Sequence, residues 1–215
     1  MAGLVSYFDI GNGSCYAGSG TTVYDLSGNN RTLTISPSNG FTYENLNGGA
    51  IKMLGGYQTE MDGATGLATG TVAYTIELWQ RCHNLFNTAC LYTLGETGDY
   101  APRGFCYSDG SLNQACSGIA NSSPGTTYCP VNTWIQIVQS HPAGGTATNY
   151  GNGVQWSTTG GGLSLGTSST IGWGRWGGGV SGARSYFAIG RVYDRALTGA
   201  EVLANFGFDR DRFDL

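Results

Sequence analysis

The sequence predicts an all-β fold that forms one domain over residues 1–215, a length within the range of an all-β sandwich. Apolar residues make up 40% of the chain and aromatic residues 12%, while only 11% are charged. This composition is sufficient for a sizeable core. The 37 glycines are therefore better explained as turn positions between many short strands than as a sign of disorder.

Turn signals separate the expected strands along the whole chain. Asparagine, aspartate and glycine tolerate the positive φ angles of tight hairpin turns, so their clusters mark strand ends. Such clusters lie at 11–13, 27–30, 47–49, 109–110 and 151–153. Their spacing predicts an antiparallel meander or a jelly roll.

Three strands have the clearest signals, and for one of them the alternation predicts which side chains lie on each face. Runs of β-branched and aromatic residues lie at 74–80, 134–140 and 186–193. Side chains alternate along a strand, so Tyr74, Ile76 and Leu78 point to one face of the first run. Glu77 and Trp79 point to the other. The first face is expected to join the core between the sheets.

One short helix is expected near the C-terminus. Thr198 can accept a hydrogen bond from the backbone of Glu201, whose side chain can reach back to the cap. This arrangement is a capping box, and the mostly apolar run 202–206 follows it.

Charge and hydropathy disfavour two classes of partner. The net charge is −4 and the pI is near 5.0, whereas nucleic-acid binders carry basic stripes and a high pI. The first nine residues lack the pattern of a secretory signal, and no stretch approaches the roughly 18 apolar residues of a membrane span. We therefore expect no nucleic-acid partner and no membrane insertion.

The six cysteines predict disulfide bonds, because an even number favours pairing. They are Cys15, Cys82, Cys90, Cys106, Cys116 and Cys129. The sequence leaves the pairing open, and buried free thiols remain an alternative. Structural zinc is disfavoured, since no two cysteines have the C-x-x-C spacing and the only histidines are His83 and His141.

Both ends of the chain resemble a known family. The resemblance rests on GLVSYFD at 3–9, YAGSGTTVYDLSGNN at 16–30 and IGRVYDRALTGAEVLANF at 189–206. The interior segments YTIELW at 74–79 and VNTWIQI at 131–137 extend it. These segments resemble the concanavalin A-like, laminin G-like modules of phage and large-virus proteins. The segment 81–130 departs from the family pattern.

The resemblance implies a two-sheet jelly roll that binds glycans or proteins, or that builds a virion surface. Our leading hypothesis is a non-enzymatic structural or decorating protein of a virus particle. Its expected partners are other capsid proteins, in an oligomer or larger assembly, and host-surface glycans. Its expected location is the virion. The alternative is an extracellular lectin or a carbohydrate-binding adhesin module.

A glycoside hydrolase is the disfavoured third hypothesis. Enzymes that share this sandwich place paired acids on one strand, as E-x-D-x-E or close variants, and glycoside hydrolysis needs two carboxylates across the scissile bond. Glu77 is the only acid in a confident interior strand, and its two-residue neighbours are Thr75 and Trp79. We therefore predict no catalytic residues.

The best candidate for ligand contact is a glycine-rich segment that carries indoles. Trp173, Arg175 and Trp176 lie in the run IGWGRWGGG at 171–179, and Arg184 and Tyr186 follow it. Aromatic rings stack on sugar C–H faces, and planar polar groups bind hydroxyls. The alternative is that an indole folds back and caps the sandwich.

Calcium is a secondary possibility at one turn. Asp25, Ser27 and Asn29 form an alternating set of oxygen-bearing side chains without the rest of an EF-hand pattern. We interpret them first as turn residues and expect no other cofactor or metal.

Overall fold

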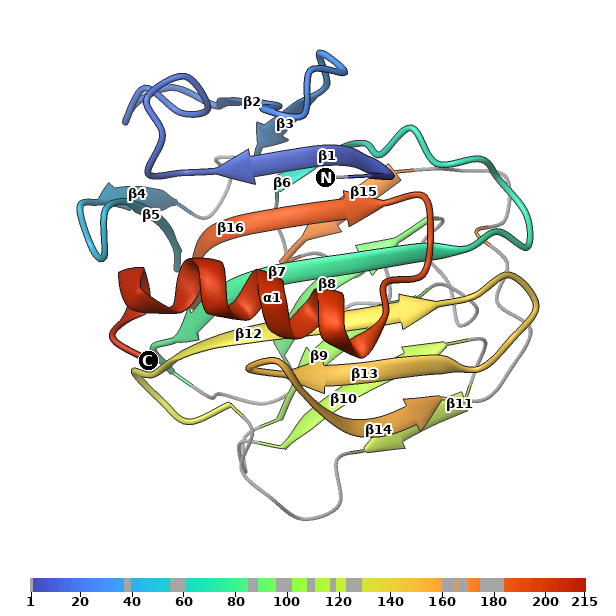
Figure 1. Ribbon diagram of the computed structural model, residues 1–215. Coiled ribbons are helices and arrows are strands. Elements are labelled where there is room, and N and C mark those ends of the chain that lie inside the picture. Colours follow the sequence, from blue (N-terminus) through green and yellow to red (C-terminus); the bar gives the residue numbers. More distant parts are fainter. Residues whose placement is uncertain are drawn as a thin grey trace.

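Two eight-stranded sheets form the two layers of the computed structural model (Figure 1). The structure describes residues 2–36, 40–54, 61–84, 89–95, 102–107, 111–116, 119–122, 129–159, 165, 170–174 and 184–215. The architecture confirms the predicted all-β sandwich with a short C-terminal helix. Within the described ranges, no helix has the length and apolar character needed to cross a bilayer.

The first sheet contains the three strands that the sequence predicts most clearly. Its order is β14 (Val154–Thr159), β13 (Ala147–Gly151), β12 (Trp134–His141), β7 (Tyr74–Cys82), β16 (Ser185–Tyr193), β5 (Ala50–Met53) and β4 (Phe41–Glu44), with β1 (Leu4–Asp9) also paired to β16. The pairs β7–β12, β7–β16 and β1–β16 are antiparallel. The central pairs thus join segments from both ends and the middle of the chain.

The second sheet lies behind the first in Figure 1. Its order is β11 (Ile119–Ser122), β10 (Leu112–Cys116), β9 (Arg103–Cys106), β8 (Ala89–Leu94), β15 (Thr170–Trp173), β6 (Met61–Ala64), β3 (Thr32–Ile35) and β2 (Thr22–Tyr24). Part of the segment that departs from the resembled family, 89–122, supplies four of these strands.

The main core lies between the two sheets, and β7 contributes to it as predicted. Tyr74, Ile76 and Leu78 belong to the same buried cluster as residues of the second sheet such as Ile171. The opposite face of β7 presents Trp79 to a separate cluster. Strand alternation therefore predicts correctly which side chains fill the core.

The outer face of the first sheet is covered by α1 (Gly199–Asp209) and the 3-10 helix η1 (Arg210–Phe213) (Figure 1). The ring of Trp79 stacks on Phe213 at 4.4 Å and on Phe206 at 5.8 Å between centroids. The predicted capping box is present: Glu201 N donates to Thr198 Oγ1 at 3.3 Å, and Thr198 N donates to Glu201 Oε2 at 2.8 Å.

A buried ionic network fixes α1 on the sheet. Arg191 of β16 donates to Glu77 of β7 at 2.9 Å and to both carboxylate oxygens of Asp209 at 2.5 and 2.9 Å. Gln136 and Asn205 donate to the two oxygens of Glu77, each at 2.8 Å. The Arg191 and Glu77 side chains are 1% and 0% exposed. Glu77, the interior-strand acid, thus has a structural role here.

Candidate functional site

An open hollow lies at the end of β1. There the turn after β1, the β4–β5 hairpin and η1 meet at one end of the molecule (Figure 1). The hollow has a volume of about 530 Å³ and is lined by Asp9, Gly11, Asn12, Gly13, Gly48 and Arg212. We call it the Asp9 hollow. Two of the predicted turns, 11–13 and 47–49, supply residues of its wall.

The β4–β5 turn needs residues that adopt positive φ angles. Asn47, Gly48 and Gly49 have φ of 47°, 82° and 130°, and only glycine and asparagine enter this region readily. A Cβ atom on Gly49 would lie 2.9 Å from both the Cα of Gly11 and the hydroxyl of Tyr43. The glycine therefore allows the two turns to approach each other closely.

Arg212 connects all three segments of the hollow. Its Nη1 donates to Asp9 Oδ1 at 2.6 Å, its Nε to Asn47 O at 2.6 Å and its Nη2 to Gly49 O at 2.9 Å. Asp9 Oδ1 also accepts from Gly11 N at 2.9 Å. The Arg212 and Asp9 side chains keep 22% and 19% of their surface exposed. A carboxylate and a guanidinium are thus held in fixed positions at the surface.

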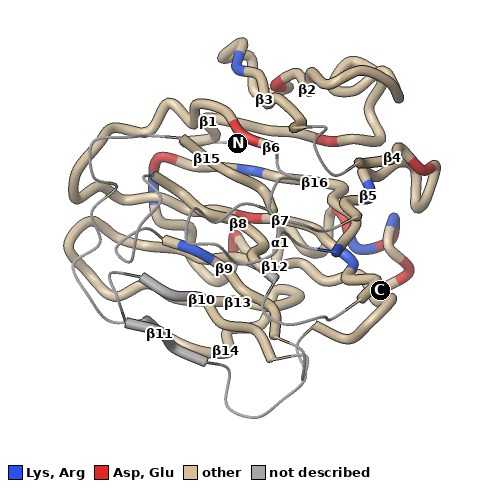
Figure 2. Tube along the Cα trace, turned by 180° about the vertical axis from the view of Figure 1, so that it is seen from behind, with Lys and Arg blue, Asp and Glu red and all other residues tan. Residues whose placement is uncertain are grey.

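The chemistry of the Asp9 hollow suits a neutral ligand rich in hydroxyl groups. A carboxylate accepts hydrogen bonds from hydroxyls, and guanidinium and amide groups donate them. Asn12 is exposed. Tyr43, a residue that is 36% exposed, does not line the hollow, but its hydroxyl lies near Gly49 in the adjoining turn. Figure 2 shows that charged positions are thinly spread over the described chain.

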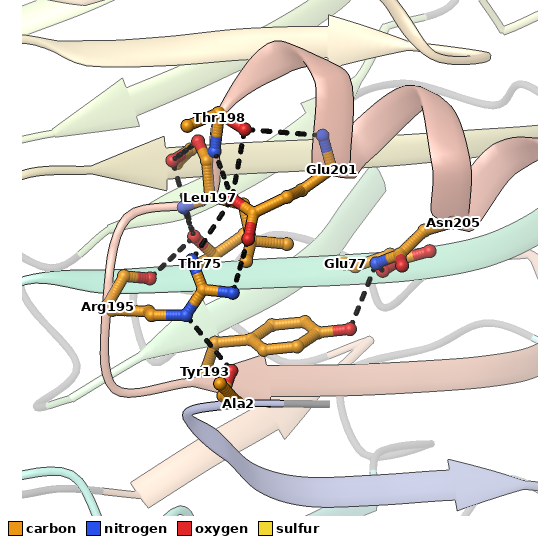
Figure 3. Close-up of polar contacts among 10 residues, drawn as sticks. Ala2, Thr75, Glu77, Tyr193, Arg195, Leu197, Thr198, Glu201 and Asn205 are labelled. Atoms are coloured by element: carbon orange, nitrogen blue, oxygen red, sulfur yellow. Dashed lines mark hydrogen bonds and ion pairs between the residues drawn. The ribbon is translucent and has the colours of Figure 1, made fainter.

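A second, smaller hollow lies beside α1 (Figure 3). Its volume is about 270 Å³ and its lining consists of Ala2, Tyr193, Arg195, Leu197, Glu201, Ala204 and Asn205. We call it the Tyr193 hollow. Arg195 donates to both oxygens of Glu201, at 3.0 and 2.6 Å, and these bonds lower the pKa of Glu201 to about 2.

The polar groups of the Tyr193 hollow bind one another. Asn205 donates to the Tyr193 hydroxyl at 2.9 Å and to Glu77 at 2.8 Å, and Glu201 also belongs to the capping box of α1. These groups fix the helix in place. The Asp9 hollow, which is larger and more open, is therefore the better candidate for a ligand.

Trp173 lies in the core, which corrects the prediction that it contacts a ligand. Its side chain is 0% exposed and packs on Phe187 at 5.1 Å between centroids. Gly190 leaves the necessary space, because a Cβ there would lie 2.7 Å from the indole Cζ2. Trp173 therefore serves packing, on the strand β15 within the main core cluster.

The other four predicted contact residues do not form a site with Trp173 in the described structure. Arg175 and Trp176 lie outside the described residues. Tyr186 is only 8% exposed and packs near Trp134, so its expected surface role is also corrected. Arg184 is partly buried, and its carbonyl accepts a hydrogen bond from the backbone N–H of His83 at 3.0 Å. None of these described residues lines the Asp9 hollow.

The calcium candidates do come together, in a turn. Asp25 Oδ1 accepts from Ser27 N at 2.9 Å and Tyr7 N at 2.8 Å, and Asp25 Oδ2 accepts from the Ser27 hydroxyl at 2.6 Å. Asn29 donates its amide to Ser27 Oγ at 2.9 Å. These contacts are those of a turn in which side chains replace backbone partners, in agreement with the primary interpretation.

The cysteines are arranged differently from the prediction. No disulfide bond joins any two of the five whose side chains the structure describes; the side chain of Cys116 lies outside this set. Burial raises the pKa of Cys15 and of Cys90 to about 12, so both are unreactive thiols. Cys82, Cys106 and Cys129 form a cluster that spacing alone did not predict.

The sequence also failed to indicate the central pair of the Asp9 hollow. Asp9 and Arg212 lie 203 residues apart, and although Asp9 ends the segment GLVSYFD at 3–9, no sequence pattern links the two residues. The available signal was the pair of glycine-rich turns, which marked two of the three segments that meet there. The third segment, η1, reaches the hollow only through tertiary packing, and local sequence does not predict that packing.

Comparisons with known proteins establish the fold. No family model and no curated protein matches the sequence. The binding domain of botulinum neurotoxin serotype G is similar over 96% of this chain and 51% of that chain, with 12% identity and a TM-score of 0.73. This chain thus spans about half the length of the neurotoxin domain.

Two further solved structures share the fold. Domain 4 of AbnA, an extracellular arabinanase of Geobacillus stearothermophilus solved with arabinotriose, matches over 94% of this chain and 98% of that one, at 18% identity and a TM-score of 0.69. Trypanosoma rangeli sialidase matches over 98% of this chain and 33% of its own, at 14% identity and a TM-score of 0.74. At these identities the likeness shows the β-sandwich; a laminin G-like or viral assignment stays a prediction.

Proposed function

We propose that this protein is a non-catalytic binding domain that holds a carbohydrate in the Asp9 hollow. The observation that carries the proposal is the fixed pair of Asp9 and Arg212 in an open hollow, with the partly exposed residue Tyr43 near Gly49 of the adjoining turn. The domain of similar fold that was solved with arabinotriose supports the proposal, since almost its whole length matches this chain.

The arrangement offers what a sugar requires. Asp9 accepts hydrogen bonds from neighbouring hydroxyls, Arg212 donates them, and Tyr43 provides an apolar surface for C–H groups. Because Arg212 is already bound to two carbonyls and to Asp9, little side-chain entropy is lost when the ligand binds.

The non-catalytic part of the proposal rests on the positions of the acids. Among the described residues that line the hollow, Asp9 is the one carboxylate, whereas glycoside hydrolysis by two carboxylates needs a pair across the bond. Glu77 is fully buried, and both of its oxygens accept hydrogen bonds. Neither acid is placed for the paired chemistry of a hydrolase.

Blocking the hollow tests the proposal. A Cβ on Gly13 meets nothing within 4 Å, and the residue lacks a positive φ, so Gly13→Gln places a side chain at the hollow without strain. Gly207 on α1 has the same properties, and Gly207→Gln is the matched control. On a glycan array and then by calorimetry, we expect saturable binding by the wild-type protein and the control. Gly13→Gln should lower affinity by about tenfold or more, a loss of about 1.4 kcal/mol.

Two outcomes would reject carbohydrate binding at this hollow. One is the absence of saturable binding by the wild-type protein across the array. The other is an affinity for a bound glycan that Gly13→Gln leaves unchanged. The folded state of both variants is checked by thermal unfolding before binding is compared.

A second candidate function is assembly on the surface of a particle, as the sequence resemblance implies. The exposed face of α1 supports it: this face is apolar or small and consists of Ala200, Leu203, Ala204, Gly207 and Phe208. Leu203 and Phe208 are 54% and 76% exposed. Contiguous exposed apolar residues are typical of protein contact surfaces.

The assembly candidate predicts self-association through α1. We expect sedimentation velocity to show a dimer or larger species for the wild-type protein. Leu203→Glu with Phe208→Glu should shift it to monomer, because each carboxylate would be buried without a partner. A wild-type protein that stays monomeric at high concentration would remove this candidate while leaving carbohydrate binding untouched.

A further inference from the structure

Three cysteines from different parts of the chain meet between the two sheets. Cys82 ends β7 of the first sheet, Cys106 ends β9 of the second, and Cys129 precedes β12. Their sulfur atoms all lie within 4.8 Å of one another. Each residue is at most 2% exposed. The cluster is therefore a buried meeting point of three thiols.

We propose that Cys82, Cys106 and Cys129 form a site for one Zn²⁺ ion. Zinc binds thiolate sulfur at about 2.3 Å, so sulfurs on one tetrahedral ion lie about 3.8 Å apart. The observed separations need only a contraction of about 1 Å or less to reach this geometry. Three thiolates leave the fourth position of the ion to a small ligand such as water.

The surroundings of the sulfurs support ligation. The buried amide of Gln80 places its Nε2 3.6 Å from the Cys129 sulfur and 3.8 Å from the Cys82 sulfur. Sulfur in a neutral thiol is a weak acceptor, whereas N–H groups that point at thiolate ligands are typical outer partners of a metal site. The amide of Gln80, which points at the sulfurs of both Cys82 and Cys129, therefore suits a Zn²⁺ ion bound by three thiolates, because such a site carries a net negative charge.

A metal ion binds all three thiols of the cluster, whereas a disulfide bond between two of them leaves the third thiol unpaired within the cluster. Only one disulfide can form among three cysteines, and its remaining thiol would stay buried beside it. Zinc binding instead releases the thiol protons to solvent and joins the first sheet to the second through one ion. The expectation against zinc relied on short C-x-x-C spacing, and here the fold, not the spacing, brings the ligands together.

Metal content and cobalt spectroscopy test the site. The full-length chain, purified under reducing conditions without chelators, is expected to contain one zinc per molecule by mass spectrometry. Replacement of zinc by Co²⁺ should give thiolate-to-cobalt charge-transfer absorption and the visible bands of a tetrahedral ion. Removal of the metal with a chelator should lower the melting temperature, and added Zn²⁺ should restore it.

Matched cysteine variants separate this cluster from other thiols. Cys106→Ser should lower Zn²⁺ affinity by about 100-fold or more. Cys90→Ser, a change at a buried cysteine on β8 outside the cluster, should leave it unchanged. Equal affinity in the two variants overturns the proposal. If Cys106→Ser does not fold, the wild-type protein decides: a disulfide found by non-reducing mass mapping, or no uptake of Zn²⁺ or Co²⁺ after reduction, also overturns it.

Discussion

Replacing Arg191 with methionine is expected to lower the free energy of unfolding by about 3 to 5 kcal/mol, as is usual when one partner of a buried ion pair is removed. Arg191 is the cation between Glu77 and Asp209, and all three side chains are buried. Methionine keeps most of the volume of arginine, so the loss arises mainly from two carboxylates left without a counter-charge. Denaturant titration followed by tryptophan fluorescence measures the change.

Two further variants identify the cause. Arg195 also donates to both oxygens of a carboxylate, that of Glu201. The side chains of Arg195 and Glu201, however, are 36% and 39% exposed. Arg195→Met should therefore cost no more than about 1 kcal/mol. Adding Glu77→Gln and Asp209→Asn to Arg191→Met should recover part of the loss, because the uncompensated charges disappear. If Arg191→Met costs as little as Arg195→Met, the network does not fix α1 as described.

Trp173→Ala is expected to destabilise the protein by about 3 to 5 kcal/mol, the usual cost of truncating a buried aromatic side chain. The indole is fully buried, and Gly190 and Phe187 are arranged around it. The change would leave a cavity in the core between the sheets. Thermal and denaturant unfolding should both shift to milder conditions.

The same variant separates the two interpretations of this tryptophan. If Trp173 serves packing, Trp173→Phe should recover much of the stability, since a ring still fills part of the space. Any effect on glycan binding should follow the folded fraction. A Trp173→Ala protein with wild-type stability and lost binding would instead indicate a contact residue and contradict the buried position.

The fold was predictable because its main signals are local. Alternation in β7 places Tyr74, Ile76 and Leu78 in the core, and the capping box of Thr198 and Glu201 begins α1. Each of these patterns depends on residues within one strand or one helical turn. Strand order was not predictable in this way, because pairs such as β1 with β16 join opposite ends of the chain.

The candidate site was less predictable, because its groups meet only through tertiary packing. Asp9 reaches Arg212 once β1 has paired with β16 and η1 has folded over the sheet. The three clustered cysteines meet only when the two sheets stack. Trp173 was misjudged because the glycines beside it suggested an exposed loop, whereas the strand β15 turns its indole inward.

The most direct test of carbohydrate binding is a crystal structure of the protein with the saccharide that binds most tightly on the array. We expect the sugar in the Asp9 hollow, with hydroxyls bound to Asp9 and Arg212 and a C–H face against Tyr43. A sugar bound in the Tyr193 hollow, or on any surface away from Asp9, would contradict the proposed site.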